Sequence, residues 1–75
     1  MKDVVITYCK PCGYLKRAQT TAAAIDEKLG VKAELVPGTG GIFQIAVGGQ
    51  VIAKRTSAGF PKEDDVVAAL QQALS

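Results

Sequence analysis

The stretch Tyr8-Cys9-Lys10-Pro11-Cys12-Gly13 decides how the rest of the chain is interpreted, because it holds the only two cysteines, with two residues between them. An apolar run at residues 4–6 precedes it and a helical pattern follows it, so both sulfurs are expected where a strand ends and a helix begins. The first turn of a helix offers unpaired N–H groups and the positive end of the helix dipole, which stabilise a thiolate. The spacing therefore predicts a dithiol built for exchange, with Pro11 in the first helical turn.

Length and composition narrow the class of protein. The 75 residues predict one domain, 1–75, with a modest core, and 48% hydrophobic and 21% charged residues are typical of a globular chain. The net charge of +2 comes from scattered side chains, so nucleic acid is not predicted as a partner. No apolar run is long enough for a membrane span, and the N-terminus lacks the pattern of a signal peptide. A cytoplasmic, reducing location is therefore predicted.

Three other interpretations of Cys9 and Cys12 are alternatives to exchange chemistry. A structural disulfide does not persist in the cytosol, and this one would close a very short loop. A structural zinc site needs about four ligands, which two cysteines and no histidine do not supply. Two incidental buried cysteines fit poorly with a strand–helix junction. We therefore predict catalytic cysteines at both positions, with no cofactor and no metal.

The segment around the dithiol reads as strand, helix and strand. Residues 2–8 predict a strand whose run of β-branched side chains alternates little, as in a central strand covered on both faces. Residues 14–29 predict a helix with an apolar stripe at spacings of three and four: Leu15, Ala18, Ala22, Ile25 and Leu29. Residues 31–36 predict the second strand. A βαβ unit of this kind makes the two strands parallel with a right-handed crossover.

The second half reads as a hairpin and a helix. Residues 37–41 predict a loop, either a flexible turn or a loop beside the cysteines that lines a groove. Residues 42–47 and 50–55 predict antiparallel strands joined at Gly48-Gly49, because both positions of a type I′ turn need positive φ. Pro61 is expected to open the last helix. The resulting fold class is α/β and thioredoxin-like, β-α-β-β-β-α with a four-stranded mixed sheet.

The core predicted from this pattern is spread over strands and helices. Its members are Val4, Ile6, Ala22, Ile25, Leu29, Ile45 and Leu70.

Several segments, the dithiol among them, carry a resemblance to a known family. They are Tyr8–Tyr14, residues 37–45, Val47-Gly48-Gly49, Ile52, Lys54-Arg55 and Gly59-Phe60. Together they make the chain similar to the selenoprotein W-like family, also grouped as SelT/SelW/SelH or Rdx proteins, as a cysteine-containing homologue with a CxxC motif. The resemblance implies a thioredoxin-like fold and thiol redox chemistry, with glutathione as a candidate partner. Relatives carry selenocysteine at the position of Cys12.

The chain departs from thioredoxin itself at one place. The larger family has a cis-proline immediately before the third strand, whereas Pro37 lies five residues before Ile42. We therefore do not assign that role to Pro37, and high activity on protein disulfides is not expected.

The leading hypothesis is a thiol–disulfide redox protein, an oxidoreductase or redox sensor, that uses Cys9 and Cys12 in cell redox homeostasis. We expect thiol or disulfide substrates and protein partners that dock at the CxxC face. We do not expect the protein to bind a membrane. One alternative is a binding module switched by the disulfide. Another is a Cu(I)-carrying domain, which soft thiolates suit, although such domains end in a strand and this chain ends in a predicted helix.

The order of attack between the two cysteines is also open to prediction. Cys9 precedes the helix and is expected to be the more exposed thiol, with Lys10 beside it, whereas Cys12 is expected inside the first turn and more covered. The position of selenocysteine in the relatives argues for Cys12 instead. From the residues themselves, Cys9 is predicted to be the nucleophile and Cys12 the resolving thiol.

Overall fold

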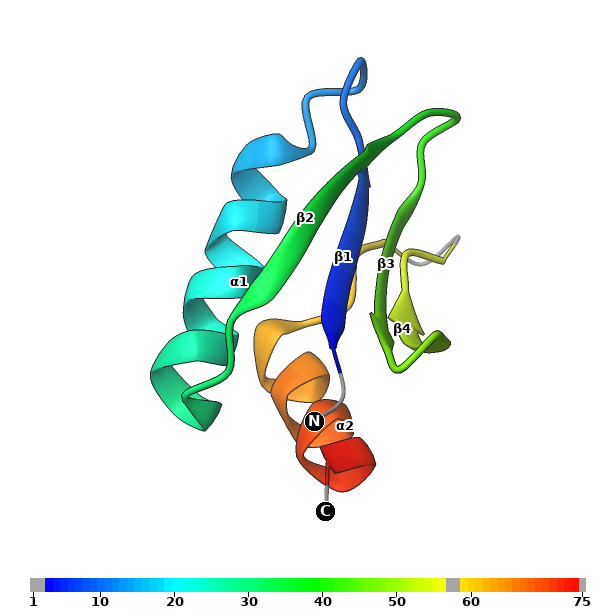
Figure 1. The fold of residues 1–75 in the computed structure, drawn as a ribbon. Coiled ribbons are helices and arrows are strands. Elements are labelled where there is room, and N and C mark those ends of the chain that lie inside the picture. The colour runs from blue at the N-terminus through cyan, green and yellow to red at the C-terminus, as the bar shows by residue number, and fades with distance from the viewer. Residues whose placement is uncertain (1–2, 57–58, 75) are drawn as a thin grey trace.

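The computed structural model describes residues 3–56 and 59–74 and contains four strands and two helices in them (Figure 1). In chain order they are β1 (Val4–Cys9), α1 (Leu15–Leu29), β2 (Ala33–Gly38), β3 (Phe43–Val47), β4 (Gln50–Lys54) and α2 (Glu63–Leu74). The predicted order β-α-β-β-β-α and the thioredoxin-like α/β class are confirmed. Within the described part of the chain, neither helix is long and apolar enough to cross a membrane.

The four strands form one mixed sheet in the order β2-β1-β3-β4. β1 lies parallel to β2 and antiparallel to β3, and in this register Ile6 is paired with Leu35 on one side and Ile45 on the other. The predicted βαβ unit and the antiparallel β3–β4 hairpin are therefore confirmed. Gly48 and Gly49 both have positive φ, 57° and 86°, as the predicted turn requires.

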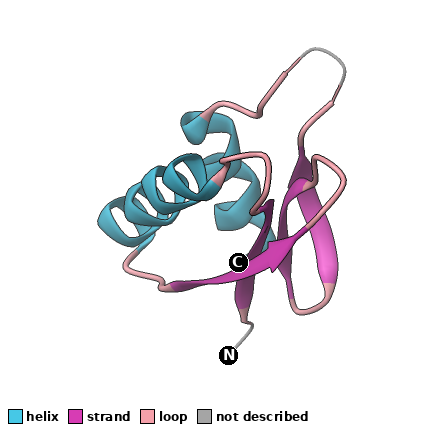
Figure 2. Cartoon of the chain, turned by 90° about the horizontal axis from the view of Figure 1, so that it is seen from above, coloured by secondary structure: helices cyan, strands magenta, loops and turns pink. Residues whose placement is uncertain are grey.

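Both helices pack on one face of the sheet (Figure 2). They contact each other as well as the strands, α1 over β1 and β2 and α2 over β3 and β4. The side chains of β1 alternate accordingly: Val4 and Ile6 are buried, whereas Val5 and Thr7 are half-buried. The prediction that β1 is covered on both faces is wrong for the described residues, since β-branched residues also suit the open face of a sheet.

The core fills the space between the sheet and the helices. Its fully buried large side chains include Ile6, Ile25, Ile45 and Leu70, all predicted, and Val66. The predicted Ala22 and Leu29 lie at its margin and are only partly buried. Removing side chains of this size from water is the main stabilising term available to so small a chain.

The α1 stripe differs from its prediction at one end. Leu15 opens the helix with 41% of its surface exposed. Thr21 is buried instead, and its hydroxyl donates a hydrogen bond to the Arg17 carbonyl at 2.9 Å. This bond satisfies a polar group that would otherwise be costly to bury.

The boundaries of two elements also differ from prediction. β2 continues through Pro37 and Gly38, which were predicted to lie in a loop. β2 is an edge strand, where a residue without an N–H is tolerated. α2 begins at Glu63, two residues after the Pro61 that is expected to open it, and Glu63, Asp64 and Asp65 lie in its first turn. Between β4 and α2, residues 57–58 lie outside the described part of the chain.

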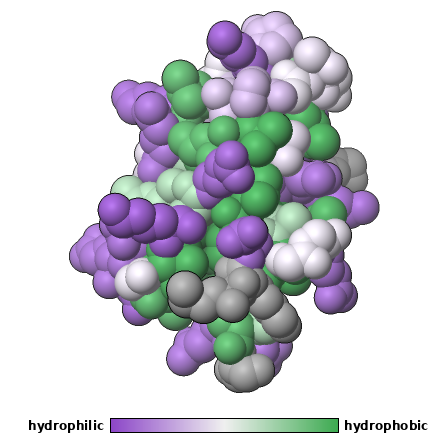
Figure 3. Space-filling model, in the orientation of Figure 1, coloured by the Kyte–Doolittle hydropathy of each residue, from purple (hydrophilic) through white to green (hydrophobic). Residues whose placement is uncertain are grey.

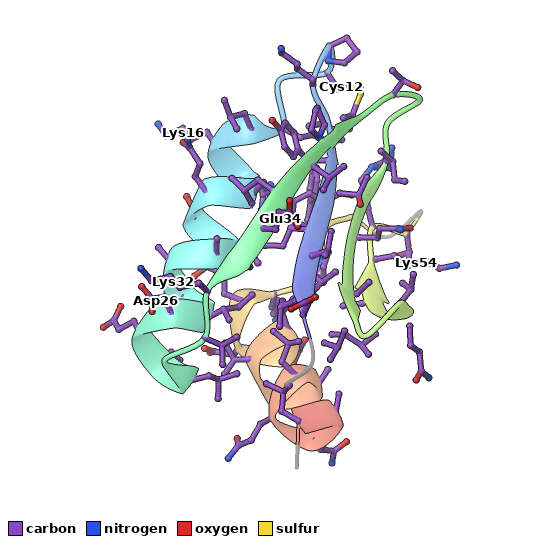
Figure 4. The ribbon with its side chains drawn as sticks, in the orientation of Figure 1. Cys12, Lys16, Asp26, Lys32, Glu34 and Lys54 are labelled. Atoms are coloured by element: carbon purple, nitrogen blue, oxygen red, sulfur yellow. A yellow bond between two sulfur atoms is a disulfide. The ribbon has the colours of Figure 1, made fainter. Side chains whose placement is uncertain are left out.

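The other face of the sheet carries no helix among the described residues. Val5, Ala46 and Val51 lie in one row of the strand register, and Val36 lies in the next row. Figure 3 shows this face as a largely hydrophobic surface interrupted by single hydrophilic side chains. Glu34 on β2 points out from it toward the viewer in Figure 4.

Candidate functional site

The two cysteines lie at the end of the sheet where β1 leaves it. Cys9 is the last residue of β1, and Cys12 follows in a turn. Their Cα atoms are 5.3 Å apart and their sulfurs are bonded as a disulfide, so the structure describes the oxidised form. α1 begins only at Leu15, with Tyr14 as its N-cap. The prediction that Pro11 and Cys12 lie within the first helical turn is therefore wrong.

The loop that carries the dithiol is closed by two backbone hydrogen bonds. The Gly13 N–H donates to the Lys10 carbonyl at 3.1 Å, and the Tyr14 N–H donates to the Cys9 carbonyl at 3.2 Å. Gly13 has φ of 81°, a left-handed conformation that a residue with a Cβ rarely adopts. This conformation turns the chain from the dithiol into α1 and explains why the helix starts after Gly13.

The exposure of the two sulfur-bearing residues is opposite to the prediction. Cys9 has 0% of its surface exposed, whereas Cys12 is exposed. The premise that Cys9 is the more exposed thiol is therefore wrong. A partner that approaches from solvent reaches Cys12 first.

The burial of Cys9 follows from its place in the sheet. It pairs with Gly38 of β2, and the next residue, Lys10, donates its N–H to the Gly38 carbonyl at 3.1 Å. The chain then folds back, so that the Tyr14 N–H reaches the Cys9 carbonyl. Cys9 is thus held by strand pairing on one side and by its own loop on the other, whereas Cys12 stands at the outer part of the loop.

A second loop lies beside the dithiol. Residues 39–42 connect β2 to β3 at the same end of the molecule as the CxxC loop (Figure 1). Figure 4 places Cys12 next to the point where this connection leaves β2. Residues 39–42 of the glycine-rich segment therefore form a loop near the cysteines, and the groove expected along this loop stays a prediction.

An aromatic cluster adjoins the dithiol loop through Tyr14, and no pattern in the sequence predicts it. Phe60 meets Tyr14 edge to face, with ring centroids 4.9 Å apart, and meets Phe43 in the same way at 5.2 Å. These rings come from the start of α1, from β3 and from the segment before α2. Gly59-Phe60 carried only a family resemblance in the sequence, and no local pattern connects residues so far apart in the chain.

Two guanidinium groups lie on this cluster. The Arg17 Cζ lies 4.1 Å from the centroid of the Phe60 ring. The Arg55 Cζ lies 6.0 Å from the Tyr14 ring and 5.9 Å from the Phe60 ring. At these distances the negative face of each ring attracts the cation. The rings therefore hold two positive charges at the aromatic cluster, which Tyr14 connects to the dithiol loop.

A groove of about 450 Å³ begins beside the dithiol loop, and it is lined by Gly13, Lys16, Arg17, Thr20 and Glu63. Positive side chains outnumber carboxylates along it, with Lys16 and Arg17 against Glu63. No group of three or more histidine, cysteine or acidic side chains in residues 3–56 and 59–74 is arranged to hold a metal ion.

Known proteins resemble the chain in sequence and in fold. The model of the Rdx family matches residues 3–72. Migration and invasion enhancer 1 of mouse is 36% identical over 72 residues, and the cattle protein of the same name is 35% identical. Each match covers 93% of this chain, which spans 63% of the length of these relatives.

Two crystal structures share the fold. A protein from Bordetella parapertussis has a TM-score of 0.88 and 30% identity, with 96% of both chains covered. A selenoprotein W-related protein from Vibrio cholerae has a TM-score of 0.87 with 99% of this chain and 98% of that chain covered, and at 24% identity the likeness concerns the fold. The family model covers nearly all of the sequence and the CxxC pair is at disulfide distance. The chain belongs to the Rdx family, which is the selenoprotein W-related family.

Proposed function

We propose that this protein carries out thiol–disulfide exchange, with Cys12 as the attacking thiolate and Cys9 as the resolving thiol. The observation that carries the proposal is the difference in exposure within one disulfide: Cys12 is exposed and Cys9 is 0% exposed. Exchange needs a sulfur that a partner can reach and a second thiol held close enough to displace it. Membership of the Rdx family supports a redox role for the pair.

The exchange reaction balances in two steps. In the reduced protein, the Cys12 thiolate attacks one sulfur of a substrate disulfide, forms a mixed disulfide and releases the other substrate sulfur as a thiolate. The Cys9 thiolate then attacks the Cys12 sulfur, forms the Cys9–Cys12 disulfide and releases the second substrate thiolate. The protein loses two electrons and two protons, which the two substrate thiols gain. A cellular thiol, with glutathione as the candidate, restores the dithiol by the reverse steps.

The setting of this reaction is part of the same proposal. We place the protein in the cytoplasm, in cell redox homeostasis, because a reducing compartment keeps the dithiol able to act repeatedly. Thiol or disulfide compounds and proteins docking at the CxxC face are its proposed partners. The exposed position of Cys12 at the end of the molecule supports access by partners of either size.

Alkylation of the Cys9→Ser and Cys12→Ser proteins tests the assignment. After reduction, each variant has one thiol, and its reaction with iodoacetamide is followed by mass spectrometry over a range of pH. We expect Cys9→Ser to keep a fast thiol and to accumulate a stable mixed disulfide with a small disulfide such as oxidised glutathione. Cys12→Ser should react at least tenfold more slowly, because its remaining thiol is buried. Faster alkylation of Cys12→Ser would show that Cys9 is the nucleophile.

A second candidate is a binding module whose surface changes with the redox state. Cys12 lies beside the 39–42 loop, so opening of the disulfide alters the surface next to both loops. Repeated turnover with a thiol reductant distinguishes the candidates. An exchange catalyst reduces many equivalents of a small disulfide, whereas a binding module reduces one equivalent and stops.

A further inference from the structure

Four cations lie around the dithiol loop. Lys10 is an exposed residue within the loop, and Lys16 and Arg17 lie on the first turn of α1, where they line the groove that starts at Gly13. Arg55 lies just after β4, with its guanidinium against the 39–42 loop. Two carboxylates, Glu63 and Asp64, line the pockets that Arg17 also lines, so the four cations outnumber them. Asp3 and Asp26 belong to the opposite end of the molecule, at the start of β1 and the last turn of α1.

The guanidinium groups of the two arginines are held against aromatic rings. The guanidinium of Arg17 lies 4.1 Å from the Phe60 centroid, on a ring that is itself fixed by Tyr14 and Phe43. A guanidinium stacked on a ring keeps the edge that carries its N–H donors available for a carboxylate. Because the ring restricts the side chain, less conformational freedom is lost when an anion binds.

Arg55 connects the aromatic cluster to the loop beside Cys12. Its Cζ lies 6.0 Å from the Tyr14 ring, two residues after Cys12 in sequence. A Cβ placed on Gly41 would lie 3.6 Å from its Nη2 atom, so the guanidinium lies directly against the 39–42 loop. The Arg55 N–H donates to the Phe43 carbonyl at 2.8 Å, which anchors the backbone of this residue to β3.

Arg17 comes from α1 and Arg55 from the segment after β4, and both guanidiniums lie against the aromatic cluster to which Tyr14, two residues after Cys12, belongs. An extended peptide whose cysteine reaches Cys12 has residues on both sides of that cysteine. Carboxylates at those residues match the two cations in sign and in the planar geometry that arginine binds well. Basic side chains at those residues would be repelled by the two arginines. Acidic and basic partners would therefore differ in their rate of encounter with the protein.

We propose that this end of the molecule selects partners whose reacting cysteine is flanked by acidic residues, and that Arg17 and Arg55 determine this specificity. The inference rests on the proposed exchange function and names the substrate class of the same site. The covalent step is unchanged: the Cys12 thiolate attacks the partner's sulfur and displaces its leaving thiol. The arginines touch the flanking residues and take no part in bond making.

Three peptide disulfides of equal length test the proposal. Each carries one cysteine linked to 2-thiopyridine and flanked by two residues on each side that are all Glu, all Gln or all Lys. Attack by the reduced protein releases pyridine-2-thione, which is measured by its absorbance. We expect the Glu peptide to react roughly tenfold faster than the Lys peptide at low salt, the lower end of electrostatic rate effects. At about 1 M salt, where the screening length is about 3 Å, the two rates should converge.

Single-residue variants test which cations cause the difference in rate between the Glu and Lys peptides. Arg17→Gln and Arg55→Gln should each lower the Glu-to-Lys rate ratio about threefold, and Arg55→Lys should keep most of it. Lys32→Gln removes the same charge near the far end of α1, where Lys32 lies in Figure 4, and should leave the ratio unchanged. Since each ratio is measured within one protein, a general loss of reactivity does not affect it. The mixed disulfide of glutathione with 2-thiopyridine, which has the same leaving group, is run in parallel to tell a preference for small anionic disulfides from a preference for acidic peptides.

The outcomes separate the two proposals. Equal rates with all three peptides at low salt would overturn the acidic preference while supporting exchange at Cys12. A ratio that falls equally in Lys32→Gln and in the two arginine variants would overturn the roles of Arg17 and Arg55. A faster reaction of the glutathione–thiopyridine disulfide than of the Glu peptide would overturn the choice of a peptide partner. Absence of pyridine-2-thione release from every peptide would contradict the exchange function itself.

Discussion

The helix-covered face of the sheet and its dithiol end use side chains in opposite ways. On the covered face, Ile6 and Ile45 have 0% exposure and sit under two helices. At the dithiol end, Cys12, Lys10 and Arg17 remain exposed around one buried sulfur, that of Cys9. β1 contributes to both regions, since its first residues build the core and its last residue is Cys9. The core and the dithiol thus lie at different positions along the same strand.

Truncation in the core should give the largest loss of stability. Ile45→Ala removes a fully buried side chain at the centre of the sheet and should lower the free energy of unfolding by about 3 kcal/mol, from lost burial and the cavity left behind. Val51→Ala is the matched control, because Val51 is 43% exposed on the open face. It should cost less than about 1 kcal/mol. Urea unfolding followed by circular dichroism measures both, and equal losses would contradict the division between the two faces.

Reduction of the Cys9–Cys12 bond should have an intermediate effect. The bond spans a sequence separation of 3, so it restricts the unfolded chain little and should contribute no more than about 2 kcal/mol. The reduced protein should therefore keep one cooperative thermal transition, with a midpoint lowered by roughly 15 °C at most. Scanning calorimetry with and without a phosphine reductant makes the comparison. Loss of the transition on reduction would make the disulfide part of the structural core.

The smallest effect is expected at the start of α1. Leu15→Gln changes a residue that the apolar stripe predicted to be buried but that is 41% exposed. We expect a change within about 0.5 kcal/mol in the free energy of unfolding. The same urea measurement gives this change, and the loss of unfolding free energy in Ile45→Ala serves as the reference for a core residue. A loss near that of Ile45→Ala would mean that Leu15 packs in solution as the periodicity predicted.

The fold was largely predictable because its signals are local. The β-branched run before Cys9, the helical period of residues 14–29 and the Gly48-Gly49 turn each act within a few residues, and each is present in the structure. The boundaries were less predictable. β2 extends through Pro37 because it lies at the sheet edge, and the strand order β2-β1-β3-β4 is not encoded in any one segment.

The position of the candidate site was predictable, but which of its two cysteines is exposed to solvent was not. Two cysteines at this spacing after a strand were sufficient to locate the dithiol. Which sulfur faces solvent depends on Gly38 pairing with Cys9 and on Gly13 turning the chain before α1 begins. Gly38 is distant in sequence from Cys9, so the local pattern does not reveal this pairing. The local pattern of a strand followed by a helix therefore predicted that Cys9 is the more exposed cysteine. The arginines on the Phe60 cluster were missed for the same reason.

The sequence by itself determined the order of strands and helices, the parallel βαβ unit, the hairpin and the location of the CxxC pair, since these depend on periodicity, turn chemistry and short-range geometry. Only the tertiary structure decided that the helices share one face, that Cys9 is buried while Cys12 is exposed, and that Arg17 and Arg55 meet the same aromatic cluster. Burial and charge clustering depend on contacts between segments far apart in the chain. Those contacts are set when the layers pack, after each segment has its own local preference.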